Sequence, residues 1–281
     1  MSDQWLPPTP PSAPGYDPPK TKRDSESWLK RRLGPIALAA FAIFKWGKIA
    51  ILFVTKAKFF VTGFSMVISI GAYTLFWGLP FAVGIVALLL IHESGHAIQM
   101  KREGMDVGGM AFVPFLGAVV WAKELEDDAL AEARVGLAGP LLGSLAAAAA
   151  LIPYAMNGDE FWLAIAYFGF FINLFNLIPV TPFDGGRAMA AISPWMWFVG
   201  LGLMAAYLVW RPNPFVILFL VLGALDVYRR WKHRKEGGVE ARAYYEVSKR
   251  NRALVGLVYV GLILALVAGM NATHLDPDTL G

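Results

Sequence analysis

The feature that most limits how this chain can fold is a series of long apolar segments, recurring from about residue 35 to residue 270. The hydrocarbon core of a bilayer is about 30 Å thick, and a helix needs about 20 apolar residues to cross it. Only 16% of the residues are charged, whereas a soluble domain typically carries about a quarter. The chain is therefore predicted to be an all-α polytopic membrane protein, with the lipid bilayer as its solvent.

Seven segments are close to the length of a transmembrane helix, although 194–210 and 213–228 are short for one. Glycine, proline and asparagine lie between neighbouring segments, for example in Asn157-Gly158-Asp159, where they favour turns. A core at 59–190 is thus predicted to be followed by additional transmembrane helices at 191–272. The predicted spans are 59–77, 79–100, 134–156, 160–180, 194–210, 213–228 and 253–270.

The N-terminal part of the chain differs from these spans. Residues 1–34 are rich in proline and then basic, so they are predicted to form a disordered cytoplasmic tail. Residues 35–58 are apolar but contain Lys45 and Lys48 in the middle of the segment. An interfacial helix keeps both ammonium groups in water, whereas a spanning helix would bury them. We therefore predict an interfacial helix at 35–58.

The distribution of basic residues predicts the topology. If 35–55 does not cross the bilayer, every basic cluster falls on one side, which the positive-inside rule identifies as the cytoplasm. The N-terminus and the basic loop 229–252 are then cytoplasmic in a multi-pass protein of the cell membrane, and 273–281 is a short tail. Because these clusters account for the net charge of +4, no nucleic-acid partner is predicted. The clusters are 20–32, 45–58, 101–102 and 229–251.

The segment 105–124, MDVGGMAFVPFLGAVVWAKE, is apolar but interrupted by three glycines and a proline. Its β-branched and aromatic residues predict a strand–turn–strand loop, a short membrane-dipping β-hairpin. Irregular backbone at membrane depth must be covered by protein or line a water-filled cavity. Two roles stay open for this loop. It can bind an unwound substrate by strand addition, or it can be a structural plug.

The second predicted span ends in three ionisable residues, His92, Glu93 and His96, within LLLIHESGHAIQM at 88–100. Ionisable groups at membrane depth are costly and mark functional sites. A separation of four residues places both imidazoles on one helix face, where they can share a zinc ion. Glu93 lies about 100° round the helix from His92, so it stands beside the ion as a candidate general base. This H-E-x-x-H pattern is typical of zinc peptidases.

A catalytic zinc site needs a third protein ligand, and the chain has no cysteine to supply it. Three glutamates follow the histidines in KELEDDALAEA, namely Glu124, Glu126 and Glu132. This stretch is typical of a solvated acidic helix start at the membrane edge, so these glutamates are weak candidates.

Asp184 is the stronger candidate for the third ligand. Pro179 and Pro182 interrupt the preceding apolar helix, and Gly185 and Gly186 follow, which allows a close approach of the backbone. A carboxylate at this depth needs a counter-charge, and a zinc ion supplies one. The alternative is that Asp184 caps a short helix at 185–192.

The combination of HESGH with NLIPVTPFDGG about ninety residues later resembles the site-2 protease family of intramembrane zinc metalloproteases. The small-residue stretch GLAGPLLGS at 136–144 is similar to that family's pattern too. The resemblance covers roughly residues 59–190. It implies one zinc ion per chain, held by His92, His96 and Asp184, with Glu93 as general base. It also implies hydrolysis of peptide bonds in or near the transmembrane segment of a membrane-protein substrate.

The same resemblance implies a catalytic role for Asn176, in substrate binding or in stabilising the oxyanion. Asn173 lies one turn earlier on the same helix face, where an interhelical hydrogen bond is at least as good an explanation. The chain departs from several relatives of that family, since no gap between its spans is long enough for a PDZ-type domain. Only about ten residues follow the last predicted span, so no CBS-type pair is expected.

Two other functions compete with proteolysis. Intramembrane His and Asp side chains also bind ions in transit, so a membrane metal-ion transporter is the main alternative. Transport predicts further carboxylates or histidines along a path to the far side, and the spans 134–156 and 253–270 contain none. A catalytically inactive membrane scaffold is the second alternative, and the presence of Glu93 argues against it.

Overall fold

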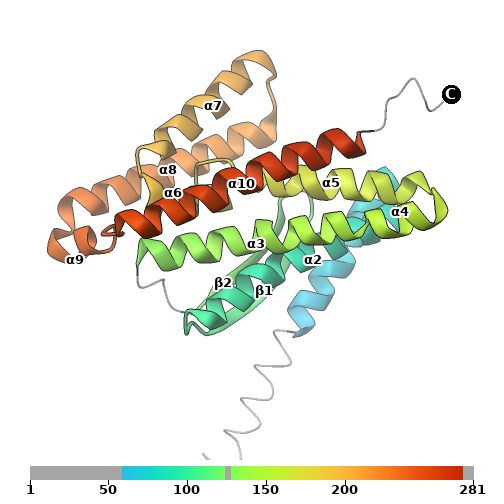
Figure 1. Cartoon of the computed structure of the whole chain (residues 1–281), viewed down its shortest axis with the longest axis horizontal. Helices are drawn as coiled ribbons and strands as arrows, with labels where there is room; N and C mark the ends of the chain where they lie inside the picture. Colours follow the sequence, from blue (N-terminus) through green and yellow to red (C-terminus); the bar gives the residue numbers. More distant parts are fainter. Residues whose placement is uncertain (1–58, 124–127, 275–281) are drawn as a thin grey trace, which may run out of the picture. The chain divides into compact units, whose positions relative to one another are not determined.

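Helices make up most of the structure, a computed structural model that describes residues 59–123 and 128–274 (Figure 1). The predicted tail at 1–34 and the interfacial helix at 35–58 lie outside these described residues, as does most of the tail 273–281. The described helices are Phe59–Trp77, α2 (Leu79–Arg102), α3 (Ala129–Ala149), α4 (Leu151–Asn157), α5 (Glu160–Asn176), α6 (Asp184–Ile192), α7 (Met196–Trp210), α8 (Pro214–Glu236), α9 (Gly238–Ala243) and α10 (Lys249–Thr273).

Four helices of the described part are long and apolar enough to cross a membrane. They are Phe59–Trp77, α2, the continuous α3–α4 segment Ala129–Asn157, and α10. The apolar helices α5 and α7 are shorter, and α8 is long but ends in a basic segment. Each predicted span falls largely on a helix, whereas a total of seven crossings stays a prediction.

Helix ends differ from the predicted bounds for local reasons. Helix α3 begins at Ala129 because the Asp128 carboxylate accepts a hydrogen bond from the Ala131 amide, which caps the helix. Helix α5 ends at Asn176, before the predicted end at 180, because Pro179 has no N–H and disfavours helix in the residue before it. Helix α8 continues through the basic segment to Glu236.

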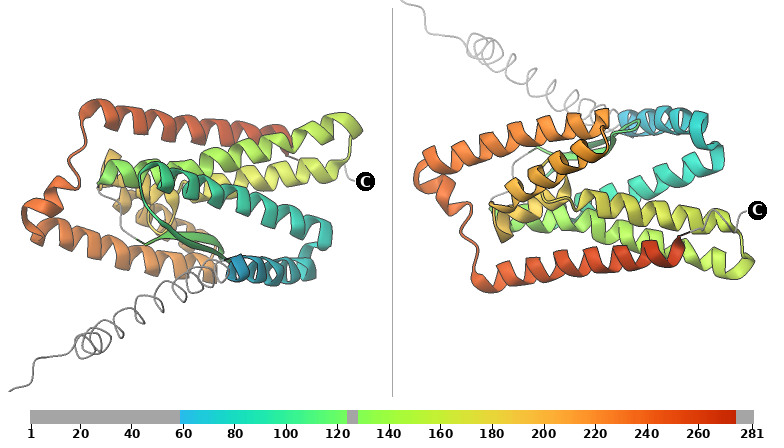
Figure 2. Two further views of the ribbon diagram at one scale, coloured as in Figure 1. Left: turned by 90° about the horizontal axis from the view of Figure 1, so that it is seen from below. Right: turned by 90° about the horizontal axis from the view of Figure 1, so that it is seen from above.

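Helix α3 lies at the centre of the packing and contacts α2, α5, α6 and α10 (Figures 1 and 2). Small residues allow its backbone to approach α2 closely. A Cβ atom on Gly95 of α2 would meet the carbonyl oxygen of Ala138 on α3. Close helix contacts of this kind are typical of membrane interiors, where packing replaces the hydrophobic effect as the source of helix association.

The loop at 105–124 forms the predicted β-hairpin. Strands β1 (Val107–Val113) and β2 (Gly117–Ala122) pair antiparallel, with Met110 opposite Val120. The hairpin packs against α2 and is tied to the Phe59–Trp77 helix, where the Thr62 hydroxyl donates to the Met110 carbonyl at 2.7 Å. The strand–turn–strand prediction is therefore confirmed.

Several charged helix ends lie together. The Ala129 amide at the start of α3 donates to the Tyr244 carbonyl between α9 and α10, at 2.9 Å. Arg134 of α3 pairs with Glu103 after the end of α2, at 3.5 Å. The basic groups at 101–102 and 229–251 thus lie at the same end of the helices, as the topology prediction requires. That this end faces the cytoplasm stays a prediction.

Candidate metal centre

Helices α2 and α6 bring His92, His96 and Asp184 together, although 92 residues separate the first from the last. The Nε2 atoms of the two histidines are 3.2 Å apart. One Asp184 oxygen lies 3.1 Å from the His92 Nε2, and the other lies 3.2 Å from the His96 Nε2. All three residues are buried, so water does not compensate their charges.

Hydrogen bonds to the other ring nitrogens fix how the two imidazoles are oriented. The Nδ1 of His96 lies 2.7 Å from the Val135 carbonyl, which can only accept, so this nitrogen carries the proton. The Nδ1 of His92 lies 2.8 Å from the Oδ1 of Asn173, whose own amide nitrogen donates to the Gly169 carbonyl. A neutral imidazole with its proton on Nδ1 has an unprotonated Nε2, so in that tautomer both Nε2 atoms face the centre as metal donors.

This arrangement fits a metal ion. Two unprotonated nitrogens and a carboxylate facing one another would repel without a cation between them. A tetrahedral zinc ion with ligands at about 2.0–2.1 Å places its donor atoms about 3.3 Å apart. The observed separations of 3.1–3.2 Å between donor atoms match that spacing. Among the described residues, this cluster is the group of His and acidic side chains that can share one ion.

Asp184 reaches the histidines because the backbone before it folds tightly. Helix α5 ends at Asn176, and the chain turns through 177–183 before α6 begins at Asp184. A Cβ atom on Gly185 would meet the carbonyl oxygen of Leu177, and one on Gly186 would meet the Thr181 amide, so only glycine fits at both positions. The N-cap position of α6 is Phe183 and not Asp184. The alternative role of Asp184 as a helix cap is therefore wrong.

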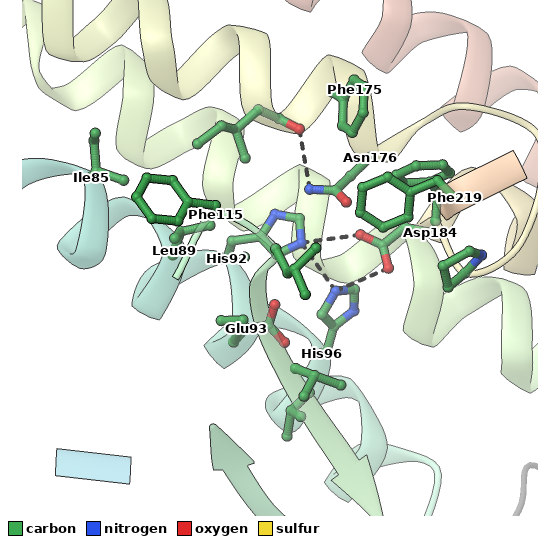
Figure 3. A pocket seen from close by; sticks show the side chains of 18 of the residues that line it. Ile85, Leu89, His92, Glu93, His96, Phe115, Phe175, Asn176, Asp184 and Phe219 are labelled. Atoms are coloured by element: carbon green, nitrogen blue, oxygen red, sulfur yellow. Dashed lines mark hydrogen bonds and ion pairs between the residues drawn. The ribbon is translucent and has the colours of Figure 1, made fainter. Parts of the chain in front are cut away.

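Glu93 lies beside the ligands and is buried, with 5% of its surface exposed (Figure 3). Its carboxylate accepts a hydrogen bond from the backbone of Val120 on β2. Antiparallel strands direct alternate amides to opposite sides. The edge of β2 that does not pair with β1 therefore faces the site.

The two asparagines of α5 have different surroundings. Asn173 is buried and bonds to His92 across the α2–α5 interface, which agrees with the interhelical hydrogen bond expected as one of its roles. Asn176 lines the cavity next to the ligands and donates to the Ile172 carbonyl of its own helix at 3.1 Å. The Asn176 amide has a second N–H that this bond does not use.

A cavity of about 480 Å³ opens beside the three ligands (Figure 3). Glu93, Asn176 and residues of β2 line it, together with many aromatic side chains. Phe215 and Phe219 of α8 contribute to its wall, and the ring of Phe219 lies 4.9 Å from that of Phe183. Reasoning from the sequence did not assign α8 to the site, because no local pattern marks a helix as a neighbour of a distant motif. The aromatic lining comprises Tyr73, Trp77, Phe115, Phe168, Phe175, Phe183, Phe215 and Phe219.

Glu132 is not a metal ligand, but the expectation that it is solvated is wrong. Only 2% of it is exposed, and its two oxygens bind Arg230 at 2.8 Å and the Tyr244 hydroxyl at 2.7 Å. The charge of Glu132 is thus compensated by a residue almost a hundred positions later in the sequence. Glu124 and Glu126 lie outside the described residues.

Comparison with known proteins gives matches over the part of the chain that holds the histidines. Residues 80–159 match Peptidase family M50. A protein of Methanocaldococcus jannaschii named as a zinc metalloprotease is 30% identical over 130 residues, which are 44% of this chain and 37% of the relative.

Two further relatives carry similar names. A protein of Mycobacterium tuberculosis named as a zinc metalloprotease, Rip3, is 31% identical over 137 residues, or 44% of this chain and 34% of the relative. One of Synechocystis, also named as a zinc metalloprotease, is 29% identical over 126 residues, or 41% and 33%. The chain therefore spans about a third of the length of these relatives. The matches agree with the resemblance to the site-2 protease family, and the cluster of His92, His96 and Asp184 agrees with the zinc in the relatives' names.

Proposed function

We propose that this chain is a member of the site-2 protease family and an intramembrane zinc metalloprotease. It hydrolyses peptide bonds in or near the transmembrane segment of membrane-protein substrates, as in regulated intramembrane proteolysis. The observation that carries the proposal is the cluster of His92, His96 and Asp184, with Glu93 beside it in one cavity. Three ligands and an adjacent carboxylate are the elements of a hydrolytic zinc site.

Each residue has a definite task in this proposal. His92, His96 and Asp184 hold one zinc ion, which when bound polarises the scissile carbonyl and lowers the pKa of water. Glu93 takes a proton from the attacking water and delivers it to the leaving amine. Burial of Glu93 keeps this proton transfer away from bulk water. The second N–H of Asn176 stabilises the oxyanion that develops on the substrate.

The β-hairpin gives the substrate a place to bind. Peptide bonds in a helix are already hydrogen-bonded, so a transmembrane substrate has to unwind before it is cut. Among the described residues β2 pairs only with β1, and its other edge faces Glu93. An extended substrate segment adds to that edge by strand addition, which presents its carbonyl groups to the ligands.

The predicted topology gives the protein a location in the cell. We place it in the cell membrane as a multi-pass protein with a cytoplasmic N-terminus, and the metal ligands near the cytoplasmic side. His96 lies less than two helical turns from Arg102, at the end of α2 that carries the basic residues. The aromatic wall of the cavity provides an apolar path for a substrate that arrives from the lipid.

Substitution Glu93→Gln tests the proposal most directly. Removal of the general base should lower cleavage of membrane proteins by about 10³-fold. Zinc content of the purified protein should be unchanged, because Glu93 is not a ligand. The measurement compares membrane-protein fragments and zinc content between wild type and the variant. Glu93-independent cleavage would contradict the proposal.

The structure gives no support to the transporter alternative. Within the described residues the donor groups close enough to share an ion form one cluster, and no second cluster marks a path across the membrane. A transporter would still move metal after Glu93→Gln. Measurement of metal flux in vesicles that contain this variant therefore separates the two functions.

A further inference from the structure

The chain just before Asp184 is bound by a side chain that no local motif predicts. The Thr181 hydroxyl donates to the Asp226 carboxylate of α8 at 2.6 Å. Thr181 is buried, with 4% of its surface exposed, and it lies three residues before the metal ligand. A hydrogen bond to a charged group is stronger than one between neutral groups. Asp226 is therefore well placed to fix the position of this turn.

The turn at 177–183 has little regular structure of its own, so its conformation depends on contacts from other helices. The Tyr259 hydroxyl of α10 donates to the Leu177 carbonyl at 2.6 Å, at the beginning of the turn. The Trp197 indole of α7 donates to the Gly186 carbonyl at 2.8 Å, just after it. Thr181 is held between these two points.

Asp226 is itself held by a charged network. The Nε of Arg230, one turn later on α8, donates to the same Asp226 oxygen at 2.7 Å. A second nitrogen of Arg230 binds buried Glu132 at the start of α3, and Glu132 also accepts from the Tyr244 hydroxyl. Helix α3 packs against both α2 and α6. The network therefore connects the turn to the helices that carry the metal ligands.

We propose that Thr181 and Asp226 are positioning residues for the metal centre, with Arg230 orienting Asp226. Their hydrogen bond fixes the turn so that the Asp184 carboxylate meets both histidines. This inference rests on the proposed function, since it assumes that the three ligands bind zinc. It also assigns a role in the site to α8, which is distant in sequence from all the ligands. Residues that orient metal ligands typically change metal affinity about 10–100-fold when they are replaced.

Substitution Thr181→Val tests the proposal. It removes the hydroxyl at nearly constant volume and leaves Asp226 paired with Arg230, so no buried charge is left alone. Zinc affinity of the purified full chain is measured by competition with a chelator, and ligand geometry by the visible absorption of bound Co²⁺. We expect zinc to bind at least tenfold more weakly. Thr181→Ser keeps the hydroxyl and should restore the wild-type affinity.

Thr273→Val is the matched control. Thr273 is equally buried, and its hydroxyl donates to the Gly269 carbonyl within α10, away from the ligands. This variant should bind zinc as the wild type does, and its thermal stability without metal should resemble that of Thr181→Val. If Thr181→Val does not fold, Asp226→Leu is used instead, since it removes the acceptor of the Thr181 hydroxyl. Arg230 is not left unpaired in this variant, because it still binds Glu132. Asp226→Leu should weaken zinc binding in the same way.

The outcomes separate this inference from the proposed function. Wild-type zinc affinity in a folded Thr181→Val or Asp226→Leu protein would overturn the positioning role. Failure of Thr181→Ser to restore affinity would overturn it as well, since the hydroxyl would then not be the relevant group. Wild-type zinc affinity after Asp184→Ala would instead contradict the metal site itself, and with it the proposed function.

Discussion

The histidine half and the aspartate half of the metal centre are held in different ways. His92 and His96 lie on the regular helix α2, and their spacing is set by helix geometry. Asp184 follows an irregular turn that side chains of α7, α8 and α10 hold in place. The first half therefore depends mainly on a regular helix packed closely against α3, whereas the second depends more on hydrogen bonds from other helices that hold the turn. The two halves should respond to different substitutions.

Gly139→Ala should have the largest effect, because it disturbs the histidine half through backbone packing. A Cβ atom at 139 would meet the Nε2 of His96 and lie 2.9 Å from the Nε2 of His92. Helix α3 would have to move away, and we expect zinc binding to be lost. Gly261→Ala in α10 is the control, since the added Cβ meets no atom within 4 Å apart from its own stretch of helix backbone. Equal zinc content in both variants would show that packing does not set the histidine positions.

Asn173→Ala should have an intermediate effect on the same half. It removes the acceptor that holds the Nδ1 proton of His92, so the ring can turn or change tautomer. We expect zinc affinity to fall about tenfold or more. Asn176→Ala is the variant to compare with it, because this substitution should leave zinc affinity unchanged and lower kcat. The reverse pattern in chelator competition and kinetic measurements would exchange the roles assigned to the two asparagines.

Tyr259→Phe should have the smallest effect, and it acts on the aspartate half. The substitution leaves the buried Leu177 carbonyl without its donor, which costs about 1–3 kcal/mol of stability. Because Thr181 and Gly186 keep their bonds, the turn should stay near its position and zinc should bind more weakly by less than tenfold. Thermal unfolding and chelator competition measure the two effects separately. Complete loss of zinc would mean that Tyr259 is the dominant anchor of the turn.

The features that could be predicted from the sequence are those that a local pattern of residues encodes. Apolar runs and turn residues located the helical segments, and many β-branched and aromatic residues interrupted by glycines and a proline predicted the hairpin. The H-E-x-x-H spacing and the residues around Asp184 selected the side chains that the structure brings together, and their role as zinc ligands stays a prediction. Each of these patterns is local, or joins two motifs that are recognisable on their own.

Contacts between unrelated segments could not be predicted in this way. Glu132 was expected to be solvated because its neighbours are acidic, and its partner Arg230 lies on a helix that carries no matching pattern. The bond between Thr181 and Asp226 and the two phenylalanines that α8 adds to the cavity are of the same kind. Hydrophobic periodicity shows which helix face is buried, but not which other helix covers it.

The anchors of the turn have a consequence for how the protein is made. A ribosome delivers Asp184 before Trp197, Asp226 and Tyr259, so all three zinc ligands exist in the growing chain before the turn has its anchors. The turn before Asp184 has its full set of anchors only after α10, the last described helix, has packed against the others. Under the proposed function, the metal centre would thus be completed late in the protein's own insertion.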